Sequence, residues 1–419
     1  MTYRIYTLGC KVNEYESEVM SDLLLNAGFK KNDHPDICIV NTCTVTNTAD
    51  SKCKKLIRSL KRKYPNAILV AVGCLIQNHK EVVEELEIDI ALGNKDKSKI
   101  VEYINNYKEK QISKIYDIDQ MDYENMSLNN SDLTRAYIKI QDGCDNYCAY
   151  CIIPYVRGHV RSKKKGDIIN EANHLVDRGH KEIVLTGIHT GNYHDNNYDL
   201  ADLLLDLTKI KNLQRIRISS IEITELNDKF LKVLKENRII VNHMHIPLQS
   251  GSDTILKSMN RKYDVKYFKE KIKKIRKVRP SINITTDVIV GFPGETEEYF
   301  KETINTIKEI NFTKLHVFPY SKREGTKAAS MSNEIDGNIK KERVKTLLKL
   351  SKKLEQNYMK ENLNQKMDFI PEVYKDGCLI GHTENYLLIK AKGNKKELNK
   401  TLTIYTKSIE YPYIISNTI

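Results

Sequence analysis

Three cysteines within eight residues carry the clearest chemical signal in this 419-residue sequence. Cys144, Cys148 and Cys151 follow a C-x3-C-x2-C pattern. Three thiolates can bind three irons of a [4Fe–4S] cluster and leave the fourth iron open, as catalytic metal sites keep an open position. They cannot complete a four-thiolate zinc site by themselves, so structural zinc would need a remote fourth ligand. The spacing alone leaves both interpretations open.

A second set of three cysteines occupies equivalent places in the first part of the chain. Cys10, Cys43 and Cys74 each follow an apolar, strand-like run by two or three residues. Ligands of an open parallel sheet collect beyond the carboxyl ends of its strands. Neighbouring strands would therefore bring these thiols together, which predicts a second cluster with a free iron. The alternative is that some of them are small buried apolar residues, as free cysteines often are.

The other three cysteines are expected to be non-ligands. Cys38 lies inside an apolar strand, and Cys378 is alone in the last segment. Cys53 lies among lysines that could lower its pKa, but it falls in a helix with no partner cysteine beside it.

Charge and composition indicate a globular protein with a polyanionic partner. The chain has 40% hydrophobic and 29% charged residues and a formal net charge of +13, which makes RNA the first candidate partner. The N-terminus has no signal-peptide pattern, and no apolar run approaches about 18 residues, so we expect a cytoplasmic protein without a membrane segment. Nine cysteines in a reducing compartment favour metal ligands over disulfides.

Residues 1–112 are predicted to form an open parallel α/β sheet, because strands and amphipathic helices alternate there. The predicted strands are 4–8, 37–40, 68–72 and 88–92, and the predicted helices are 14–27, 48–63 and 81–86. Residues 107–132 are polar and lack periodicity, so they are interpreted as a connection.

Residues 130–358 are predicted to form a partial (β/α)6 barrel, with its working face at the carboxyl edge of the strands. The predicted strands are 136–141, 182–185, 215–219, 241–246, 283–290 and 315–318. Arg157, His159, Arg161 and the lysines 163–165 are expected to form a basic collar near this edge.

Polar residues and a glycine near this edge are candidates for cofactor binding. Glycine allows a ligand close to the backbone, and Ser, Gln and Glu side chains can bind amino, carboxylate and ribose groups. A lone His or Glu is more often a local hydrogen-bonding residue, so no catalytic side chain beyond the cluster ligands is predicted. The candidates are Tyr150, Thr186, Gly187, Ser220, Glu222, His245, Gln249 and Asp287.

Residues 361–419 are predicted to form a small β-barrel after a lysine-rich helix at 340–362. Its predicted strands are 367–374, 379–383, 386–390 and 402–406.

The sequence resembles the radical SAM methylthiotransferases over nearly its whole length. The similar motifs are Tyr6–Asn13, Asn41–Thr46, Gly73-Cys74, the cysteine loop with Tyr150, His245–Gly251 and Asp287–Thr296, and Gly381–Tyr386 is similar to the RNA-binding TRAM domain. The resemblance implies a radical SAM barrel, a TRAM-like third domain and two [4Fe–4S] clusters.

The resemblance also implies a mechanism. Cys144, Cys148 and Cys151 would hold the cluster that binds S-adenosylmethionine, whose reduction gives a 5′-deoxyadenosyl radical. Cys10, Cys43 and Cys74 would hold an auxiliary cluster that presents sulfur, methylated by a second S-adenosylmethionine. Such chemistry needs a water-poor pocket.

Leu8–Asn13 resembles the branch that methylthiolates C2 of N6-threonylcarbamoyladenosine at tRNA position 37. The expected partners are the anticodon stem-loop and an external one-electron donor, and the protein is expected to be a monomer. The N6-isopentenyladenosine branch is the alternative, since two residues carry the distinction. Two other classes stay open: an iron–sulfur electron carrier, and a non-catalytic tRNA-binding protein with zinc.

Overall fold

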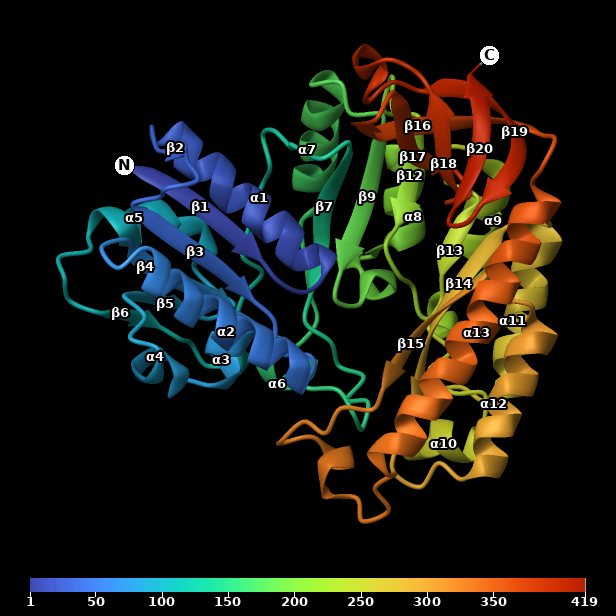
Figure 1. The fold of residues 1–419 in the computed structure, drawn as a ribbon, viewed down its shortest axis with the longest axis horizontal. Helices are drawn as coiled ribbons and strands as arrows, with labels where there is room; N and C mark the ends of the chain where they lie inside the picture. Colours follow the sequence, from blue (N-terminus) through green and yellow to red (C-terminus); the bar gives the residue numbers. More distant parts are fainter. Residues whose placement is uncertain (419) are drawn as a thin grey trace.

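The computed structural model of the chain describes residues 1–418 and begins with a six-stranded sheet in the order β2-β1-β3-β4-β5-β6 (Figure 1). All its strand pairs are parallel. The strands are β1 (Thr2–Thr7), β2 (Lys30–Lys31), β3 (Ile37–Thr42), β4 (Ile68–Gly73), β5 (Ile90–Leu92) and β6 (Ile112–Lys114). The helices are α1 (Lys11–Asn26), α2 (Asn47–Lys63), α3 (Cys74–Asn78), α4 (Val82–Glu85) and α5 (Ile100–Asn105).

Local sequence explains these elements. Every residue of β3 is buried, as expected for a central parallel strand covered on both faces. In α2, Thr46 caps the first turn by accepting a hydrogen bond from the Ala49 amide, while the helix buries Cys53, Ile57 and Leu60. Its lysines and arginines lie mainly on the other face, and two of them, Lys54 and Arg58, pair with Glu85.

The predicted parallel sheet is confirmed, although its elements differ in detail and β2 and α5 were not predicted. Helix α1 begins at Lys11 and not at residue 14. The short helix α3, which Cys74 opens, was not predicted because a five-residue helix carries little periodicity. Strand β6 extends the sheet to Lys114, so a boundary at residue 112 falls inside a strand.

The six predicted barrel strands are present, and neighbouring strands run parallel, so the partial barrel is confirmed. They are β7 (Arg135–Asp142), β9 (Glu182–Gly187), β12 (Arg215–Ile218), β13 (His243–His245), β14 (Asn283–Val290) and β15 (Lys314–Pro319). Two sheets, β12-β9-β7-β8 and β13-β14-β15, meet at a bridge between Ile216 and Ile240. The barrel stays open between β7 and β15.

Short strands and helices complete the central domain. An antiparallel edge strand, β8 (Arg161–Ser162), joins β7, and β10 (His194–Asp195) pairs with β11 (Tyr198–Asp199). The helices are α6 (Ile153–Arg157), α7 (Lys165–Asp177), α8 (Leu200–Leu207), α9 (Asp228–Glu236), α10 (Asp253–Ser258), α11 (Val265–Val278), α12 (Glu297–Ile310) and α13 (Gly337–Glu361).

The connection between the first two domains is more than a linker. Met126 and Leu128 are buried in the core of the central domain, together with Tyr15 and Val19 of α1. The same core cluster therefore includes α1, the connection and the barrel. This packing was not predicted, because the connection is mostly polar and contains few apolar residues.

The last domain is a closed barrel, which confirms the predicted small β-barrel, and it has five strands in the order β16-β17-β18-β20-β19. Its strands are β16 (Lys366–Lys375), β17 (Cys378–Thr383), β18 (Leu388–Lys392), β19 (Leu402–Glu410) and β20 (Tyr413–Thr418). Strand β20 was not predicted. The third strand begins at Leu388 and not at Tyr386, because Tyr386 lies in a turn with φ of 65°.

This C-terminal barrel packs against the amino end of the central strands (Figure 1). Arg215 donates hydrogen bonds to the carbonyls of Asp368 (2.8 Å) and His382 (3.2 Å). Arg217 donates to the Glu384 carbonyl, and Asn283 donates to the Asn385 carbonyl. None of the described helices combines the length and the apolar character needed to cross a membrane.

Candidate active site

The first cysteine site lies at the carboxyl edge of the N-terminal sheet. Cys43 directly follows β3, Cys74 opens α3 directly after β4, and Cys10 is the N-cap residue of α1. Because β1, β3 and β4 are neighbours, the three cysteines follow adjacent strands at one edge of the sheet, and Cys74 acts on the ionisation of both Cys10 and Cys43. Cys43 and Cys74 are buried, whereas Cys10 is exposed.

A glycine lets the chain bring Cys10 close to Cys43. Gly9 has φ of 113°, and a Cβ atom added there would lie 2.8 Å from Cβ and 3.1 Å from Sγ of Cys43. No other residue type fits both the backbone angle and this space. The loop is therefore shaped so that the two thiols can share one ligand.

Burial keeps the free thiol of Cys43 protonated, because it raises the pKa of Cys43 to about 12. A metal held by the thiols of this site must displace their protons, so binding and deprotonation are coupled.

The second cysteine site is a loop that leaves β7 and ends in α6. Gly143, with φ of 74°, turns the chain so tightly that an added Cβ atom would lie 1.8 Å from the His159 carbonyl oxygen. The Cys151 amide then donates to the Cys148 carbonyl at 2.9 Å. Burial raises the pKa of Cys151 to about 12.

Cationic side chains support two of these three sulfurs. Arg261 donates a hydrogen bond from Nη1 to Sγ of Cys148 at 3.2 Å and pairs with Glu222. His189 places Nδ1 3.7 Å from Sγ of Cys144 and pairs with Glu225 through Nε2. Burial alone would lower the pKa of His189, but Cys144 and Glu225 raise it to about 10.

The structure places the predicted cofactor-binding residues along the same edge. Glu222 contacts the cysteine site through Arg261, and Oδ1 of Asp287 lies 3.2 Å from Nε2 of His245. Gln249 is bonded through its backbone to Asp287 and Ile289 of β14. Thr186 and Gly187 end β9, Ser220 follows β12, and Tyr150 lies beside Cys151.

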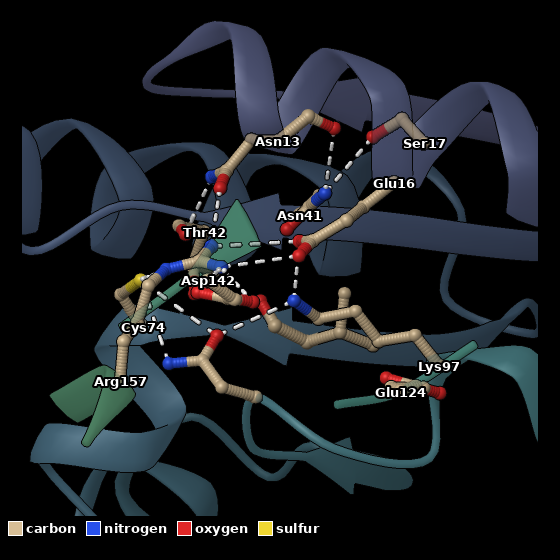
Figure 2. A network of polar contacts seen from close by, with 12 residues as sticks. Asn13, Glu16, Ser17, Asn41, Thr42, Cys74, Lys97, Glu124, Asp142 and Arg157 are labelled. Atoms are coloured by element: carbon tan, nitrogen blue, oxygen red, sulfur yellow. Dashed lines mark hydrogen bonds and ion pairs between the residues drawn. The ribbon is translucent and has the colours of Figure 1, made fainter. Parts of the chain in front are cut away.

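A buried network of charges joins the two cysteine sites (Figure 2). Arg157, at the end of α6, donates from Nε to Sγ of Cys74 at 3.4 Å. Its Nη1 atom donates to both carboxylate oxygens of Asp142, at 3.1 and 3.0 Å, and to Glu16 at 3.1 Å. Asp142 in turn accepts from the amide of Gly143, which precedes Cys144. The Arg157 guanidinium thus contacts Cys74, a candidate ligand of the first site, and Asp142, which accepts a hydrogen bond at the start of the second site's loop.

Other groups complete the network. Asn13 accepts from Arg157 at 2.9 Å, and Asn94 donates to Sγ of Cys74 at 3.6 Å. Lys97 and Lys139 pair with Glu16. These cations overcome the cost of burial, so the pKa of Glu16 lies well below its usual value, as does the pKa of Asp142. Both carboxylates are therefore ionised at neutral pH.

The prediction of a basic collar is wrong for two of its residues. Arg157 and Lys163 are fully buried, Arg157 in the network above and Lys163 in a pair with Glu171. A charge run along the sequence does not show which side chains turn inward to meet a carboxylate.

Cys53 also differs from expectation. Its side chain is buried, and burial raises its pKa to about 11, although its sequence neighbours are lysines. It has a cysteine beside it: Sγ of Cys53 lies 3.4 Å from both the amide nitrogen and the carbonyl oxygen of Cys43. Cys53 thus packs behind the first site. Cys38 is buried in the same core, and Cys378 opens β17.

Four residues that support the cysteines were not predicted to do so: Arg157, Arg261, Asn13 and Asn94. Arg157 lies six residues after Cys151, and Asn13 lies three residues after Cys10, so nearness to a cysteine was the available signal. Arg261 and Asn94 approach their sulfurs from distant segments, so no pattern of neighbouring residues indicates their role.

Both sites have the donors that iron–sulfur clusters use. Each offers three cysteine thiols, hydrogen-bond donors aimed at a sulfur, and a glycine that keeps the loop tight. Within residues 1–418, no group of three or more His, Cys, Asp or Glu side chains is arranged to hold a single metal ion.

Family comparisons agree with this division of the chain. Residues 138–307 match the Radical SAM superfamily, and residues 2–93 match a family described as uncharacterized protein family UPF0004. The second region contains Cys10, Cys43 and Cys74.

Two relatives and one solved structure are similar to this chain. Threonylcarbamoyladenosine tRNA methylthiotransferase MtaB of Bacillus subtilis (strain 168) is 43% identical, covering 98% of this chain and 95% of the relative. tRNA-2-methylthio-N(6)-dimethylallyladenosine synthase of Clostridium tetani (strain Massachusetts / E88) is 34% identical, covering 98% of this chain and 95% of that relative. The radical S-adenosylmethionine methyltransferase TsrM of Kitasatospora setae has a TM-score of 0.56 at 13% identity, covering 75% of this chain and 72% of that chain, which supports the fold. The chain therefore belongs to the radical SAM tRNA methylthiotransferase family.

Proposed function

We propose that this protein inserts a methylthio group at C2 of N6-threonylcarbamoyladenosine at position 37 of tRNA. The observation that carries the proposal is the pair of cysteine sites on two domains, joined by Arg157. The Bacillus subtilis relative, whose name states this nucleoside, is more similar to the chain than the dimethylallyladenosine synthase (43% against 34%).

Each cysteine site has a separate task in this proposal. Cys144, Cys148 and Cys151 would hold the [4Fe–4S] cluster that binds S-adenosylmethionine, and Cys10, Cys43 and Cys74 would hold a second cluster. With S-adenosylmethionine bound, these groups supply one-electron chemistry at an unreactive carbon, a sulfur atom and a methyl group.

The chain itself positions and shields these groups. Arg261, held by Glu222, and His189, held by Glu225, orient Cys148 and Cys144. Arg157 and Asn94 orient Cys74. Hydrogen bonds to the sulfurs tune the reduction potential of a cluster and fix its ligands.

Binding of S-adenosylmethionine falls to residues of the carboxyl edge. Glu222, Ser220, His245, Gln249 and Asp287 offer acceptors and donors for amino, carboxylate and ribose groups. The remaining candidates are Tyr150, within the cysteine loop, and Thr186 and Gly187, at the end of β9.

The partners follow from the reaction. The substrate is the anticodon stem-loop of tRNA, an external donor supplies single electrons, and tRNA as substrate places the enzyme in the cytoplasm. The protein would act as a monomer, because one chain contains both cysteine sites and the barrel.

Mass spectrometry of tRNA nucleosides tests the proposal. The anaerobically reconstituted protein is incubated with S-adenosylmethionine, a reductant and tRNA from a strain that lacks the gene. Appearance of the methylthio form of threonylcarbamoyladenosine is expected. A methylthio group on isopentenyladenosine would contradict the proposed substrate nucleoside, whereas the family assignment would stand. Release of no 5′-deoxyadenosine would instead favour an electron carrier.

A further inference from the structure

The segment that follows β15, residues 320–331, contacts the loops of both cysteine sites. It leaves the last barrel strand and extends toward the N-terminal domain before the chain returns to α13 (Figure 1). The Ala328 amide donates a hydrogen bond to the Ala149 carbonyl at 2.7 Å, and Ala149 lies between Cys148 and Cys151. Among the described strands, β7 and β15 do not pair, so this segment crosses the open side of the barrel.

Arg323 of this segment joins it to the N-terminal domain. Its Nη2 atom donates to the Thr44 hydroxyl at 2.8 Å, and its Nη1 atom donates to Oδ1 of Asn47 at 2.5 Å. The same Nη1 atom lies 2.7 Å from Oδ2 of Asp50. Ser321 adds a fourth contact, because its hydroxyl accepts a hydrogen bond from the Asn47 amide at 3.1 Å. One side chain of the barrel domain thus contacts three residues of the N-terminal domain.

The three residues that Arg323 contacts belong to the turn after Cys43 and to the first turn of helix α2. Thr44 directly follows Cys43, and Asn47 is the first residue of α2. The Thr44 hydroxyl also donates to Oδ1 of Asp50 at 2.7 Å, which closes a network of hydrogen bonds around the turn. Because this network fixes the residue next to Cys43, the position of Cys43 depends on Arg323.

The pair of Arg323 and Asp50 is shielded from water. Arg323 is 4% exposed, and the Asp50 side chain is 16% exposed. Charge-assisted hydrogen bonds are among the stronger contacts in such surroundings. A cavity of about 900 Å³ lies beside the pair, and His79, Tyr155 and Lys327 help to line it. Both terminal nitrogens of Arg323 already have protein partners, which favours a contact between domains over a contact with a ligand in the cavity.

Arg323 and Arg157 support different cysteines of the first site. Arg157 donates to Sγ of Cys74 and to Asn13, whereas Arg323 contacts the turn after Cys43. Arg157 lies after the first barrel strand, and Arg323 lies after the last one. The first site is therefore fixed against the barrel domain at two separate points.

We propose that Arg323 is a positioning residue, which holds Cys43 in place relative to the cysteine loop of the second site. The inference rests on the proposed function, in which a radical formed at the second site and sulfur held at the first site act on one carbon of the substrate. A displacement of about 1 Å at a reacting centre can cost on the order of 100-fold in rate. Loss of Arg323 should therefore separate formation of the radical from transfer of sulfur.

The test compares variants of this contact with a control in the same segment. The variants are Arg323→Met, Arg323→Lys, Asp50→Asn and the double variant Arg323→Met/Asp50→Asn. The control is Lys322→Met, since Lys322 is exposed and its ammonium lies 3.6 Å from Glu334 of its own domain. Reconstituted full-length proteins are assayed for iron, for 5′-deoxyadenosine and for methylthio product on threonylcarbamoyl RNA. Hydrogen exchange of residues 41–53 is measured on the same proteins.

We expect Arg323→Met to keep about eight irons per chain and to release 5′-deoxyadenosine as wild type does. Its yield of methylthio product per 5′-deoxyadenosine should fall about 10- to 100-fold. Arg323→Lys should lose less, because a lysine keeps the charge opposite Asp50 but cannot make all the hydrogen bonds of a guanidinium.

The double variant should be no worse than the more severe single variant, because both changes remove the same contact. Hydrogen exchange of residues 41–53 should be faster in every variant of Arg323 or Asp50. Lys322→Met should match wild type in both measurements.

Four outcomes would overturn the inference. An equal fall in 5′-deoxyadenosine and in product would place the effect at the second site. A higher KM for RNA at an unchanged product yield would assign Arg323 to RNA binding. Loss of about half of the iron would make Arg323 a requirement for holding a cluster at all. Unchanged hydrogen exchange of residues 41–53 would show that Arg323 does not hold the turn after Cys43.

Failure of the proposed function looks different. Wild type would then release 5′-deoxyadenosine without methylthiolating the threonylcarbamoyl RNA. The hydrogen-exchange comparison would still decide whether Arg323 fixes the turn after Cys43.

Discussion

The two cysteine sites use the same ligands but are built in opposite ways. The second site is local: three cysteines of one loop, between β7 and α6. The first site takes one cysteine from behind each of three strands, 33 and 31 residues apart in sequence. Each receives one arginine N–H···S hydrogen bond, from Arg261 at Cys148 and from Arg157 at Cys74.

The two sites therefore have different structural requirements. A loop of eight residues can keep its spacing as long as its ends are held. The first site depends on the register of a whole sheet and on a guanidinium from another domain. We therefore expect the first site to be the more sensitive to changes at the boundary between the domains.

Replacing one cysteine should have the largest effect on activity, and the defect should depend on which of the two sites loses its cysteine. Cys144→Ala should abolish 5′-deoxyadenosine release and all product. Cys74→Ala should abolish methylthio transfer while 5′-deoxyadenosine is still released. Iron content should fall from about eight to about four per chain in either variant, as expected for loss of one [4Fe–4S] cluster. If Cys74→Ala also stopped 5′-deoxyadenosine release, the two sites would not be functionally separate.

Arg157→Gln should be the next most severe change, because it leaves Glu16 and Asp142 buried with less positive charge. Removing one partner of a buried ion pair costs about 3–5 kcal/mol. Urea unfolding of the metal-free protein measures this loss. The control is Arg58→Gln, which breaks an exposed pair with Glu85 and should cost less than about 1 kcal/mol. Equal losses in the two variants would contradict the network.

The same network sets a pH dependence of stability. The folded-state pKa values of Glu16 and Asp142 lie below their unfolded values, so their contribution is present above about pH 4 and is lost as the pH falls further. The stability difference between wild type and Arg157→Gln should therefore shrink below about pH 4. A constant difference down to pH 2 would contradict this.

A smaller effect is expected from Arg261→Gln, made in a protein whose Cys10, Cys43 and Cys74 are alanines. Loss of the hydrogen bond and charge at Cys148 should shift the cluster potential by about 60 mV to more negative values, equivalent to one charge-assisted hydrogen bond of about 1.4 kcal/mol. An EPR-monitored redox titration measures it. Arg261→Lys should shift the potential less. An unchanged potential would show that Arg261 only packs.

The smallest effect concerns Glu18, on helix α1, whose N-cap residue is Cys10. Burial raises its pKa to about 7, while Ser131 and Asp132 of the interdomain connection donate hydrogen bonds to it. Its neutral form is favoured on folding, so the stabilisation is present below pH 4.5 and is lost as the pH rises through 7. Glu18→Gln should therefore stabilise the metal-free protein by about 1 kcal/mol at pH 8 and not at pH 4. The exposed Glu84→Gln should change stability little at either pH.

The local site was the easier one to predict from sequence. The spacing of Cys144, Cys148 and Cys151 is visible without a fold. Cys10, Cys43 and Cys74 required the additional step of placing three strands side by side, which strong strand–helix alternation made possible. The first step uses the spacing of a motif and the second uses hydrophobic periodicity, and both are local properties of the chain.

The supporting charges could not be predicted in the same way. Arg157 reads as a solvent-facing residue until the fold brings Glu16 and Asp142 to it from two other elements. Tyr386 reads as the start of a strand, yet it lies in a turn and stacks on His243 of the barrel. Contacts between distant segments depend on packing, and no pattern of neighbouring residues encodes them.

The attachment of the C-terminal barrel has a consequence for anyone who shortens this protein. Arg215, Arg217 and Asn283 hold its loops by their carbonyl groups, and Tyr386 covers the amino end of the central strands. Deleting residues 361–419 would therefore expose these side chains to water. The C-terminal barrel therefore covers part of the central domain, and a truncated protein would lack these contacts.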